Sequence, residues 1–456
     1  MLSWEKLLCH IRPRDLHRSG VSMGTAAGRT EIERDYDRIL FATPTRRLAD
    51  KTQVYPMEEH ASVRTRLTHS HEVSNLARSI GVRLAFDFAE EVFGKDHEQL
   101  KVKRNVPPLL AAVGLAHDLG NPPFGHQGEV AIQQWFRDNG TGNASQVDTD
   151  FVKFDGNAQT FRLITRLQFM NDQFGLNLTL GTLAALMKYP SVYGSSDMGG
   201  YSKHGIFRSE RTTAEEVWEH TGLKEGMRHP LAYVMEACDD IAYSIIDAED
   251  TVKKGYASFY DLIDHLESSS ASDPVIEKVI EVSWKKNEDL KKEDLSSREL
   301  NDMSMQMFRV IAIAEMVNAA TSTFVENIHV ILDGSIQPGF ELIKNSPCAH
   351  LCRATKEFDK RHGFQHRDVL RLELQGNSYI KKTMEMLWRA ISCDDLDNRP
   401  FERYVFGDIS ENYRRVYGRS EKRFYDKCQL LCDAISGMTE SHLIKKHDLY
   451  KSLENV

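Results

Sequence analysis

Apolar residues that recur every three or four positions are the feature that most constrains the fold of this chain. Val73, Ala77, Ile80 and Leu84 follow one another at this spacing, which puts them on one face of a helix. The same pattern runs through residues 106–116, 161–169, 178–187, 231–252, 305–324, 369–391 and 422–437. Proline is scarce, with 13 in 456 residues, and the alternation typical of strands is weak. We therefore predict a mostly α protein with at most a small β-hairpin.

Two stretches between the predicted helices have the composition of mobile loops. Residues 138–150 and 191–205 are rich in Gly, Ser, Asn and Asp, which favour turns and irregular structure. The second stretch is a candidate lid. A serine-rich segment at 268–273 and a charge run at 285–300 are typical of a solvated connection and helix face. We place a boundary between two helical regions near residues 253–275.

Charge and cysteine content exclude several classes of protein. The 58 Lys and Arg against 67 Asp and Glu give a net charge of −9, so there is no global basic field for nucleic acid or anionic membranes. Seven cysteines without a CxxC pair argue against a disulfide framework and a Cys-rich zinc site. With no run of about 18 apolar residues and no secretory signal at the start, we predict a cytoplasmic protein without a membrane span.

The stretch HDLGNPPFGHQGE at 117–129 concentrates ionisable side chains around two prolines. His117 and Asp118 end an apolar helical run, and the LGNPPFG that follows cannot continue a regular helix. Two other segments also offer metal ligands: SVRTRLTHSHEVSNLA upstream, with His69, and MEACDDIAYSIIDAED downstream, with Asp239. Imidazole and carboxylate ligands that leave positions for water or phosphate oxygens suit Mn²⁺, Mg²⁺, Fe²⁺ or Zn²⁺.

The order H…HD…D, with RLTHS, HDLGNPPFGHQGE and DDIAY, resembles the HD-domain superfamily of metal-dependent phosphohydrolases. Within it the closer match is to the deoxynucleoside-triphosphate triphosphohydrolases, particularly bacterial dGTPases. Four further stretches carry the resemblance: ERDYDRILFATPTRRLADKTQV, FDGNAQTFRLI, LMKYP and SGMT. It therefore extends from about residue 30 to about residue 440.

The resemblance implies a metal site and a catalytic pair. The metal ligands it implies are His69, His117, Asp118 and Asp239. The catalytic pair is His126 and Glu129, spaced so that one helical turn brings them together. The cofactor is a divalent ion, Mn²⁺ or Mg²⁺ before Fe²⁺, Co²⁺ or Zn²⁺. The implied reaction is water attack on the α-phosphorus of a dNTP, preferentially dGTP, which yields the deoxynucleoside and inorganic triphosphate.

Further positions match the family's substrate contacts. The residues are Arg66 and Lys188 for the triphosphate, Gln53 and Tyr243 for the sugar, Asp247 as a further substrate-facing position, and Phe364 and Glu373 for the base. For the base, a core Phe364 and a surface ion pair between Glu373 and Arg371 fit the sequence equally well. Asp240 is then a neighbour of the site rather than a ligand.

The resemblance also implies a domain organisation and partners. Residues 1–50 form an N-terminal arm and the start of the family region, 51–255 the HD phosphohydrolase core, and 256–456 a C-terminal helical region for base recognition and oligomer contacts. The implied assembly is a homo-oligomer, a hexamer. Single-stranded DNA and a nucleotide effector are further candidate partners. The basic residues of 352–371 are candidates for contacting the triphosphate, a neighbouring subunit or a nucleic acid, and a solvated helix face fits most of them at least as well.

Two other functions are compatible with the same motifs. One is a different HD-domain nucleotide phosphohydrolase or phosphodiesterase. The other is a regulatory protein that senses nucleotides without hydrolysing them.

Overall fold

A computed structural model describes residues 1–17, 28–57, 63–139, 149–168, 173–195, 200–201, 203–269, 272–421 and 423–454. Most of the predicted mobile loop at 138–150 lies outside these residues, as do parts of the candidate lid at 191–205 and of the segment at 268–273. The described chain is all-helical, which confirms the predicted fold class. Its only strand-like pairings are isolated bridges, Thr52 with Thr65 and Val192 with Ile206.

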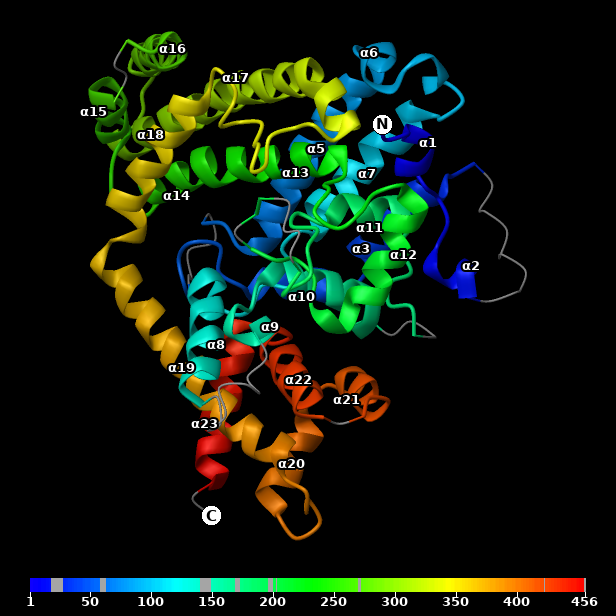
Figure 1. Ribbon diagram of the computed structural model, residues 1–456. Helices are drawn as coiled ribbons and strands as arrows, with labels where there is room; N and C mark the ends of the chain where they lie inside the picture. The colour runs from blue at the N-terminus through cyan, green and yellow to red at the C-terminus, as the bar shows by residue number, and fades with distance from the viewer. Residues whose placement is uncertain are drawn as a thin grey trace.

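Two long antiparallel helices form the centre of the molecule, α5 (Arg66–Phe86) and α7 (Val102–Ala116) (Figure 1). The helical spacing seen in the sequence is confirmed, since Val73, Ala77, Ile80 and Leu84 are all buried. The backbones approach closely at Gly114, where an added Cβ would lie 2.8 Å from Cα of Ser74. This contact brings His69 and His117 toward one another from separate helices.

Shorter helices surround this pair. Before it come α1 (Trp4–Leu7), α2 (Pro13–His17), α3 (Glu31–Leu40), α4 (Thr43–Arg47) and η1 (Leu48–Asp50). Between and after its members lie α6 (Ala89–Phe93), η2 (Lys95–His97), α8 (Gly125–Asn139), α9 (Thr149–Val152), α10 (Gly156–Arg162), η3 (Leu163–Leu167), α11 (Leu180–Leu186), η4 (Arg208–Glu210) and α12 (Arg211–Thr221).

The helix expected at 231–252 is interrupted. It consists of α13 (Pro230–Ile241), a π-helical turn η5 (Ala242–Ile246) and α14 (Asp247–Lys253). A π turn inserts an extra residue into the helical repeat. Residues before and after it therefore lose the simple register that the sequence spacing implies.

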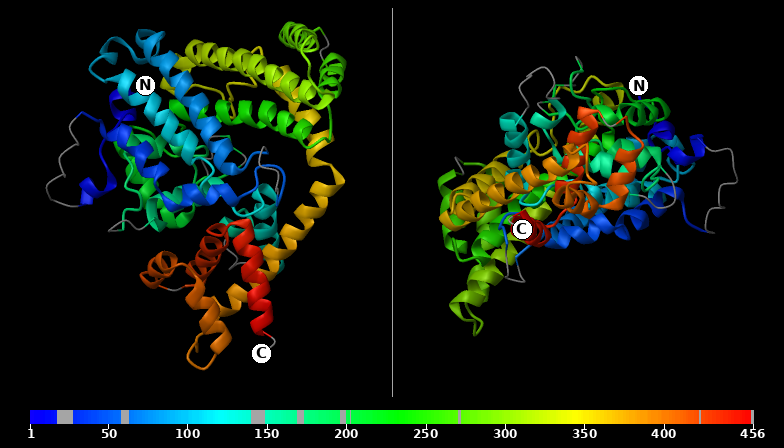
Figure 2. Two further views of the ribbon diagram at one scale, coloured as in Figure 1. Left: turned by 180° about the vertical axis from the view of Figure 1, so that it is seen from behind. Right: turned by 90° about the horizontal axis from the view of Figure 1, so that it is seen from below.

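The C-terminal half adds a second group of helices. It contains α15 (Phe259–Ser269), α16 (Pro274–Leu290), α17 (Ser297–Asp333), α18 (Ala349–Asp359), η6 (Lys360–Phe364) and α19 (Arg367–Ser392), then α20 (Pro400–Asp408), α21 (Glu411–Gly418), α22 (Phe424–Ser436) and α23 (Glu440–Glu454). Helix α19 runs from the upper helices to the lower C-terminal ones, where the chain ends (Figure 2). One hydrophobic cluster extends from Trp4 to Tyr450, and the boundary near residues 253–275 stays a prediction.

Helix α17 is the one described helix that is long and apolar enough to cross a membrane by length and composition alone, whereas the sequence predicts no span. Phe308, Met316 and Phe324 on this helix are fully buried in the hydrophobic cluster. The core helix of a globular protein meets the same two criteria.

Candidate active site

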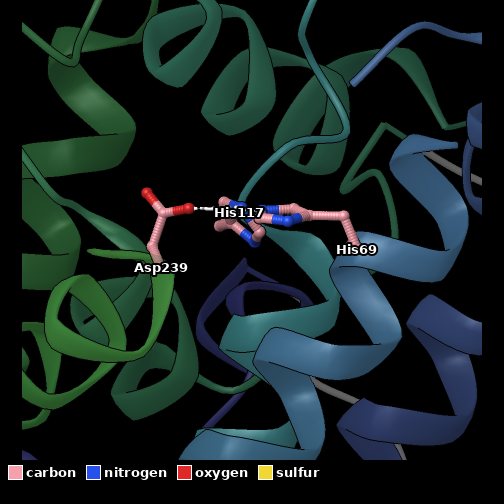
Figure 3. Close-up of side chains that lie close together, drawn as sticks. All are labelled: His69, His117 and Asp239. Atoms are coloured by element: carbon pink, nitrogen blue, oxygen red, sulfur yellow. Dashed lines mark hydrogen bonds and ion pairs between the residues drawn. The ribbon is translucent and has the colours of Figure 1, made fainter. Parts of the chain in front are cut away.

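Three side chains from three helices converge on one point. His69 comes from α5, His117 from the end of α7 and Asp239 from α13, and one possible ligand atom of each lies within 4.8 Å of the others (Figure 3). Oδ1 of Asp239 is 3.3 Å from Nε2 of His69 and 3.5 Å from Nε2 of His117. Two imidazoles and a carboxylate at this separation could hold a divalent metal ion.

The tautomer of His117 favours metal binding. Its Nδ1 lies 2.7 Å from the carbonyl oxygen of Gly114, and a carbonyl can only accept, so Nδ1 carries the proton. In the neutral imidazole, the form that binds a metal ion, Nε2 has the lone pair and faces the cluster. This Nε2 is buried without a hydrogen-bond partner among the described residues. Such a nitrogen fits a metal ligand, whose outer nitrogen is typically bonded to a carbonyl. In His69 it is Nε2 that faces Asp239, and the outer Nδ1 has no hydrogen-bond partner in the described part of the chain.

The charges of the cluster also suit a bound cation. Burial alone would lower the pKa of His117, but the carboxylates of Asp118 and Asp239 outweigh it and raise that pKa to about 9. Burial would conversely raise the pKa of Asp118, but the cationic His117 and Arg66 lower it to about 2. The carboxylates thus retain negative charge that a metal ion would neutralise.

Asp118, the fourth ligand implied by the resemblance, lies beside this trio rather than within it. Its Oδ2 accepts a 2.5 Å hydrogen bond from Arg66, and its Oδ1 accepts one of 2.6 Å from Nδ2 of Asn121. Oδ1 is also 3.5 Å from Nε2 of His117. Its role as a ligand stays a prediction.

The predicted catalytic pair lies at the start of α8. Nδ1 of His126 is 3.3 Å from Oε2 of Glu129, and Oε1 of Glu129 accepts a 2.7 Å hydrogen bond from the backbone N–H of Gly156. The glutamate is therefore fixed at both oxygens and the imidazole at one nitrogen. The His126 side chain is 68% exposed, which leaves its Nε2 accessible to a bound molecule.

The turn that leads into α8 is fixed by residues distant in the sequence. Phe124 and Gly125 both adopt left-handed backbone conformations, with φ of 63° and 54°. The N–H of Phe124 donates to Glu440 at 3.0 Å. A Cβ on Gly125 would lie 2.4 Å from the guanidinium of Arg66, so only glycine lets Arg66 approach this turn.

One cavity of about 280 Å³, here the central cavity, joins these groups. Its lining includes these members of the predicted site: Gln53, Arg66, His117, Asp118, His126, Glu129, Lys188, Asp239 and Tyr243. The lining also includes Asn121, Asn157, Tyr189, Lys203, Asp240 and Lys356, none of which the sequence predicted as an individual substrate contact. Asn157 and Tyr189 belong to the quoted GNAQTFR and LMKYP stretches. Lys203 lies in the candidate lid at 191–205, and Lys356 lies among the basic residues of 352–371 that are candidates for contacting anions.

Lys188 carries its charge into the central cavity. Its Nζ lies 3.2 Å from Oδ2 of Asp239 and 3.9 Å from Glu236. Burial would lower the pKa of Lys188, but these two carboxylates outweigh it and raise that pKa. The backbone carbonyl of Lys188 accepts a 2.6 Å hydrogen bond from Nε of Arg228, which is paired with Glu236. Lys188 is therefore a fixed cation.

The two predicted sugar contacts line the cavity, and the predicted substrate-facing residue Asp247 is not in the lining. Gln53 and Tyr243 are in the lining, and the side-chain oxygen of Gln53 is buried without a partner among the described residues. Asp247 follows the π turn and is fully buried, away from the lining. Burial raises the pKa of Asp247 well above its usual range.

The two predicted base contacts lie outside the lining of the central cavity. The ring of Phe364 is 5.8 Å from that of Tyr243, so it lies next to a residue that lines the cavity. Glu373 is half-buried on α19, and burial raises its pKa. Among the described residues, no ion pair joins Glu373 to Arg371.

Comparison with known proteins agrees with this geometry. A family model described as HD domain matches residues 66–244. Proteins from Listeria monocytogenes serovar 1/2a and Listeria innocua serovar 6a, both named deoxyguanosinetriphosphate triphosphohydrolase-like protein, are 34% identical over the whole of both chains. The chain belongs to the deoxyguanosinetriphosphate triphosphohydrolase family. A relative from Yersinia pestis (strain Pestoides F) named deoxyguanosinetriphosphate triphosphohydrolase is 29% identical over 92% of this chain and 93% of its own.

Membership of the deoxyguanosinetriphosphate triphosphohydrolase family confirms the resemblance and makes the protein a hydrolase. The residues matched by the HD domain begin at Arg66 and end at Ser244. They contain all three members of the converging trio.

Proposed function

We propose that this protein hydrolyses deoxynucleoside triphosphates, preferentially dGTP, to the deoxynucleoside and inorganic triphosphate. The observation that carries the proposal is that a potential metal site, the His126–Glu129 pair and the cations Arg66 and Lys188 share one cavity. Phosphate-ester hydrolysis needs such neighbours: neutralised phosphate oxygens, a nucleophilic water and a group that moves a proton. The names of the relatives support dGTP as the substrate.

The metal ligands are His69, His117 and Asp239, with Asp118 as a fourth. When bound, a divalent ion supplies Lewis-acid chemistry to the phosphate. Mn²⁺ or Mg²⁺ is the first expectation, with Fe²⁺, Co²⁺ or Zn²⁺ as alternatives, because mixed imidazole and carboxylate sites accept all of them.

Side chains of the protein bind the triphosphate and transfer the proton. Arg66 and Lys188 bind the triphosphate through charge-assisted hydrogen bonds. His126, oriented by Glu129, holds or moves a proton at Nε2, either from the attacking water or to the departing 5′-oxygen. Gly156 fixes Glu129 through its N–H, so the orientation of His126 is set before substrate arrives.

Sugar and base contacts extend the proposal beyond the cavity lining. Gln53 reads the 3′-hydroxyl, and its unpartnered side-chain oxygen supports this role. Tyr243 packs on the sugar, with Asp247 behind it. Phe364 and Glu373 contact the guanine. Because both lie outside the cavity lining, the base must extend beyond Tyr243 to reach them.

The domain organisation, assembly and effectors that we propose rest on the family resemblance. We assign residues 51–255 to the HD core, 1–50 to an N-terminal arm and 256–456 to a region for base recognition and oligomer contacts. A homohexamer in the cytoplasm is the expected state, and single-stranded DNA or a second nucleotide is a candidate effector.

One screen tests the proposal. The purified protein is incubated with each dNTP and rNTP and with Mn²⁺, Mg²⁺, Co²⁺, Fe²⁺ or Zn²⁺, and products are separated by ion chromatography. We expect dGTP to react fastest and to yield deoxyguanosine and triphosphate in equal amounts. Release of pyrophosphate or monophosphate would instead indicate another HD-domain phosphohydrolase. Tight dGTP binding without turnover in every metal would indicate a nucleotide sensor.

A further inference from the structure

A second cavity adjoins the central one. It has a volume of about 600 Å³, and its lining includes Asp240 and Lys356, which also line the central cavity. Nζ of Lys356 donates to Oδ1 of Asp240 at 2.6 Å. A single ion pair from α18 and α13 therefore stands between the two spaces.

The second cavity is rich in positive charge. Its lining has five basic residues, Lys344, His350, Arg353, Lys356 and Lys360, against the two acids Asp240 and Glu357. Such an excess stands out in a chain whose net charge is −9. It lies on the side of the central cavity where Lys356 approaches the ring of Tyr243, 5.8 Å away.

Two of these cations lack an acidic partner. In the part of the chain that the structure describes, no carboxylate forms an ion pair with Arg353 or Lys360. Lys344 and His350, by contrast, pair with Glu341 and Asp273. Arg353 and Lys360 are exposed, so both can reach an anion in the cavity.

The arrangement on α18 is electrostatically costly. Arg353, Lys356 and Lys360 follow one another at three- and four-residue spacing and share one face of the helix. Like charges at this spacing repel and destabilise a helix. A ligand with several negative charges would relieve that repulsion, whereas a single negative charge could neutralise only part of it.

The apolar part of the cavity lining would strengthen the binding of an anion. Ile343 and Cys352 are buried and apolar, and Ala349 lies beside them. Charges that meet beside apolar groups are screened less than charges in open water. The volume lies within the range of small-molecule sites.

From these observations we propose that the second cavity binds a polyphosphate chain through Arg353, Lys356 and Lys360. Two sources share that chemistry. One is inorganic triphosphate that leaves the central cavity past the Asp240–Lys356 pair, which rests on the proposed function. The other is the phosphate chain of a second nucleotide.

Binding can be measured without turnover. Inorganic tripolyphosphate is titrated into the metal-loaded protein by calorimetry, with wild type compared with Arg353→Glu/Lys360→Glu. A milder variant, Arg353→Ala/Lys360→Ala, covers the case in which charge reversal perturbs folding. Lys285→Glu/Lys286→Glu is the matched control, because both lysines are exposed on α16 and line neither cavity.

We expect two tripolyphosphate sites per chain in wild type and in the control, one in each cavity. In both Arg353/Lys360 variants the second site should weaken by about tenfold or more, the effect of losing roughly one charge-assisted contact. dGTP hydrolysis at low product concentration should stay within about twofold of wild type. An unchanged second site in the variants, or a single site in wild type, would overturn the proposal.

A parallel titration with a dGTP analogue bearing an imido group between the α- and β-phosphorus distinguishes the sources. If tripolyphosphate alone fills the second site, the ligand is the product. If the analogue also binds there, the site accepts nucleotides as well. Failure of both compounds to bind there would refute the polyphosphate site, even if dGTP hydrolysis itself is confirmed. Absence of hydrolysis with an intact second site would refute only the proposed function.

Discussion

At the scale of single residues, the histidines divide by exposure. His69 and His117 are buried, with 1% and 8% of their surface accessible, while 68% of the His126 side chain is exposed. Buried imidazoles with unpartnered nitrogens suit a metal site, and an exposed imidazole held by one carboxylate suits proton transfer. Two predictions separate these roles.

Replacing His126 by Ala should impair chemistry and leave the metal site intact. Among the described residues, the imidazole forms no hydrogen bond or ion pair with a member of the His69–His117–Asp239 trio. Loss of a proton-transfer group lowers kcat by about 10²–10⁴-fold. The measurements are kcat with dGTP and metal content by mass spectrometry, with Gln127→Ala on the same helix as the control. Loss of bound metal from His126→Ala would show that this histidine was assigned the wrong role.

Adjacent aspartates should respond differently to removal of their charge. Asp239 lies in the trio, whereas the carboxylate of Asp240 is bonded to Lys356. Asp239→Asn should weaken metal binding by at least about tenfold, since even outer-shell partners contribute that much. Asp240→Asn should retain metal. Metal content after equilibrium dialysis tests both variants. If Asp240→Asn lost metal and Asp239→Asn kept it, Asp240 would be the ligand instead of Asp239.

At the scale of elements, the helix that carries Asp239 depends on its first residues. His229 caps α13, with Nδ1 accepting from the N–H of Leu231 at 3.1 Å. Because Nδ1 accepts, Nε2 carries the proton and donates to the carbonyl of Leu7 at 3.1 Å. Only the neutral imidazole makes both bonds, because protonation of Nδ1 removes the acceptor of the Leu231 N–H. Further along, the π turn decides which side chains of the same helix reach the central cavity.

Acid should therefore destabilise the protein partly through His229. Burial lowers its pKa to about 4, although the Leu7 carbonyl opposes this shift. The folded state then binds fewer protons than the unfolded state, so this contribution is complete above about pH 6.5 and is lost as the pH falls toward 4. At full burial it amounts to about 3 kcal/mol.

Urea denaturation between pH 7 and pH 4 measures this effect. His229→Asn keeps a capping side chain that does not titrate, so its free energy of unfolding should fall less steeply with acid than that of wild type. His71→Asn, at an exposed position on α5, should keep the wild-type slope. Identical slopes for wild type and His229→Asn would contradict the role given to this histidine.

At the scale of the whole molecule, the C-terminal helices hold the N-terminal part of the site together. Glu440, at the start of α23, accepts hydrogen bonds from the N–H groups of Thr52 and Phe124 at 2.6 and 3.0 Å. The ammonium of Lys51 donates to the carbonyls of Asn121 and Ser436 at 2.5 and 2.8 Å. Residues nearly 390 positions apart thus fix the turn between the metal site and α8.

Glu440→Ala should weaken both the fold and the activity. The N–H groups of Thr52 and Phe124 share one oxygen, Oε1 of Glu440, so Ala would leave both buried donors unpaired at a cost of about 1–3 kcal/mol. Phe124 would lose its anchor just before α8, and kcat should fall because His126 is no longer positioned. Urea denaturation and dGTP turnover test this. Glu454→Ala, at an exposed ion pair with Arg389, should change neither, and equal behaviour of the two variants would contradict the anchoring role.

The helical segments and the family motifs could be predicted from the amino-acid sequence alone. The buried residues of α5 and α7 recur at helical spacing, and this is a local property that neighbouring residues settle. The HD stretch and its partners led to the family that the comparisons confirm. The roles of individual site residues stay predictions.

How those segments combine depends on packing between distant parts of the chain. Arg66 binds Asp118, Asp247 is buried after a π turn, and Lys203, Lys356 and Glu440 reach the site region from segments distant in sequence. Such contacts join residues far apart in the chain, and their side chains carry no periodic signal of the partner they will meet. Spacing along a chain specifies a helix and its buried face, but only packing specifies which faces meet and which charges then share one cavity.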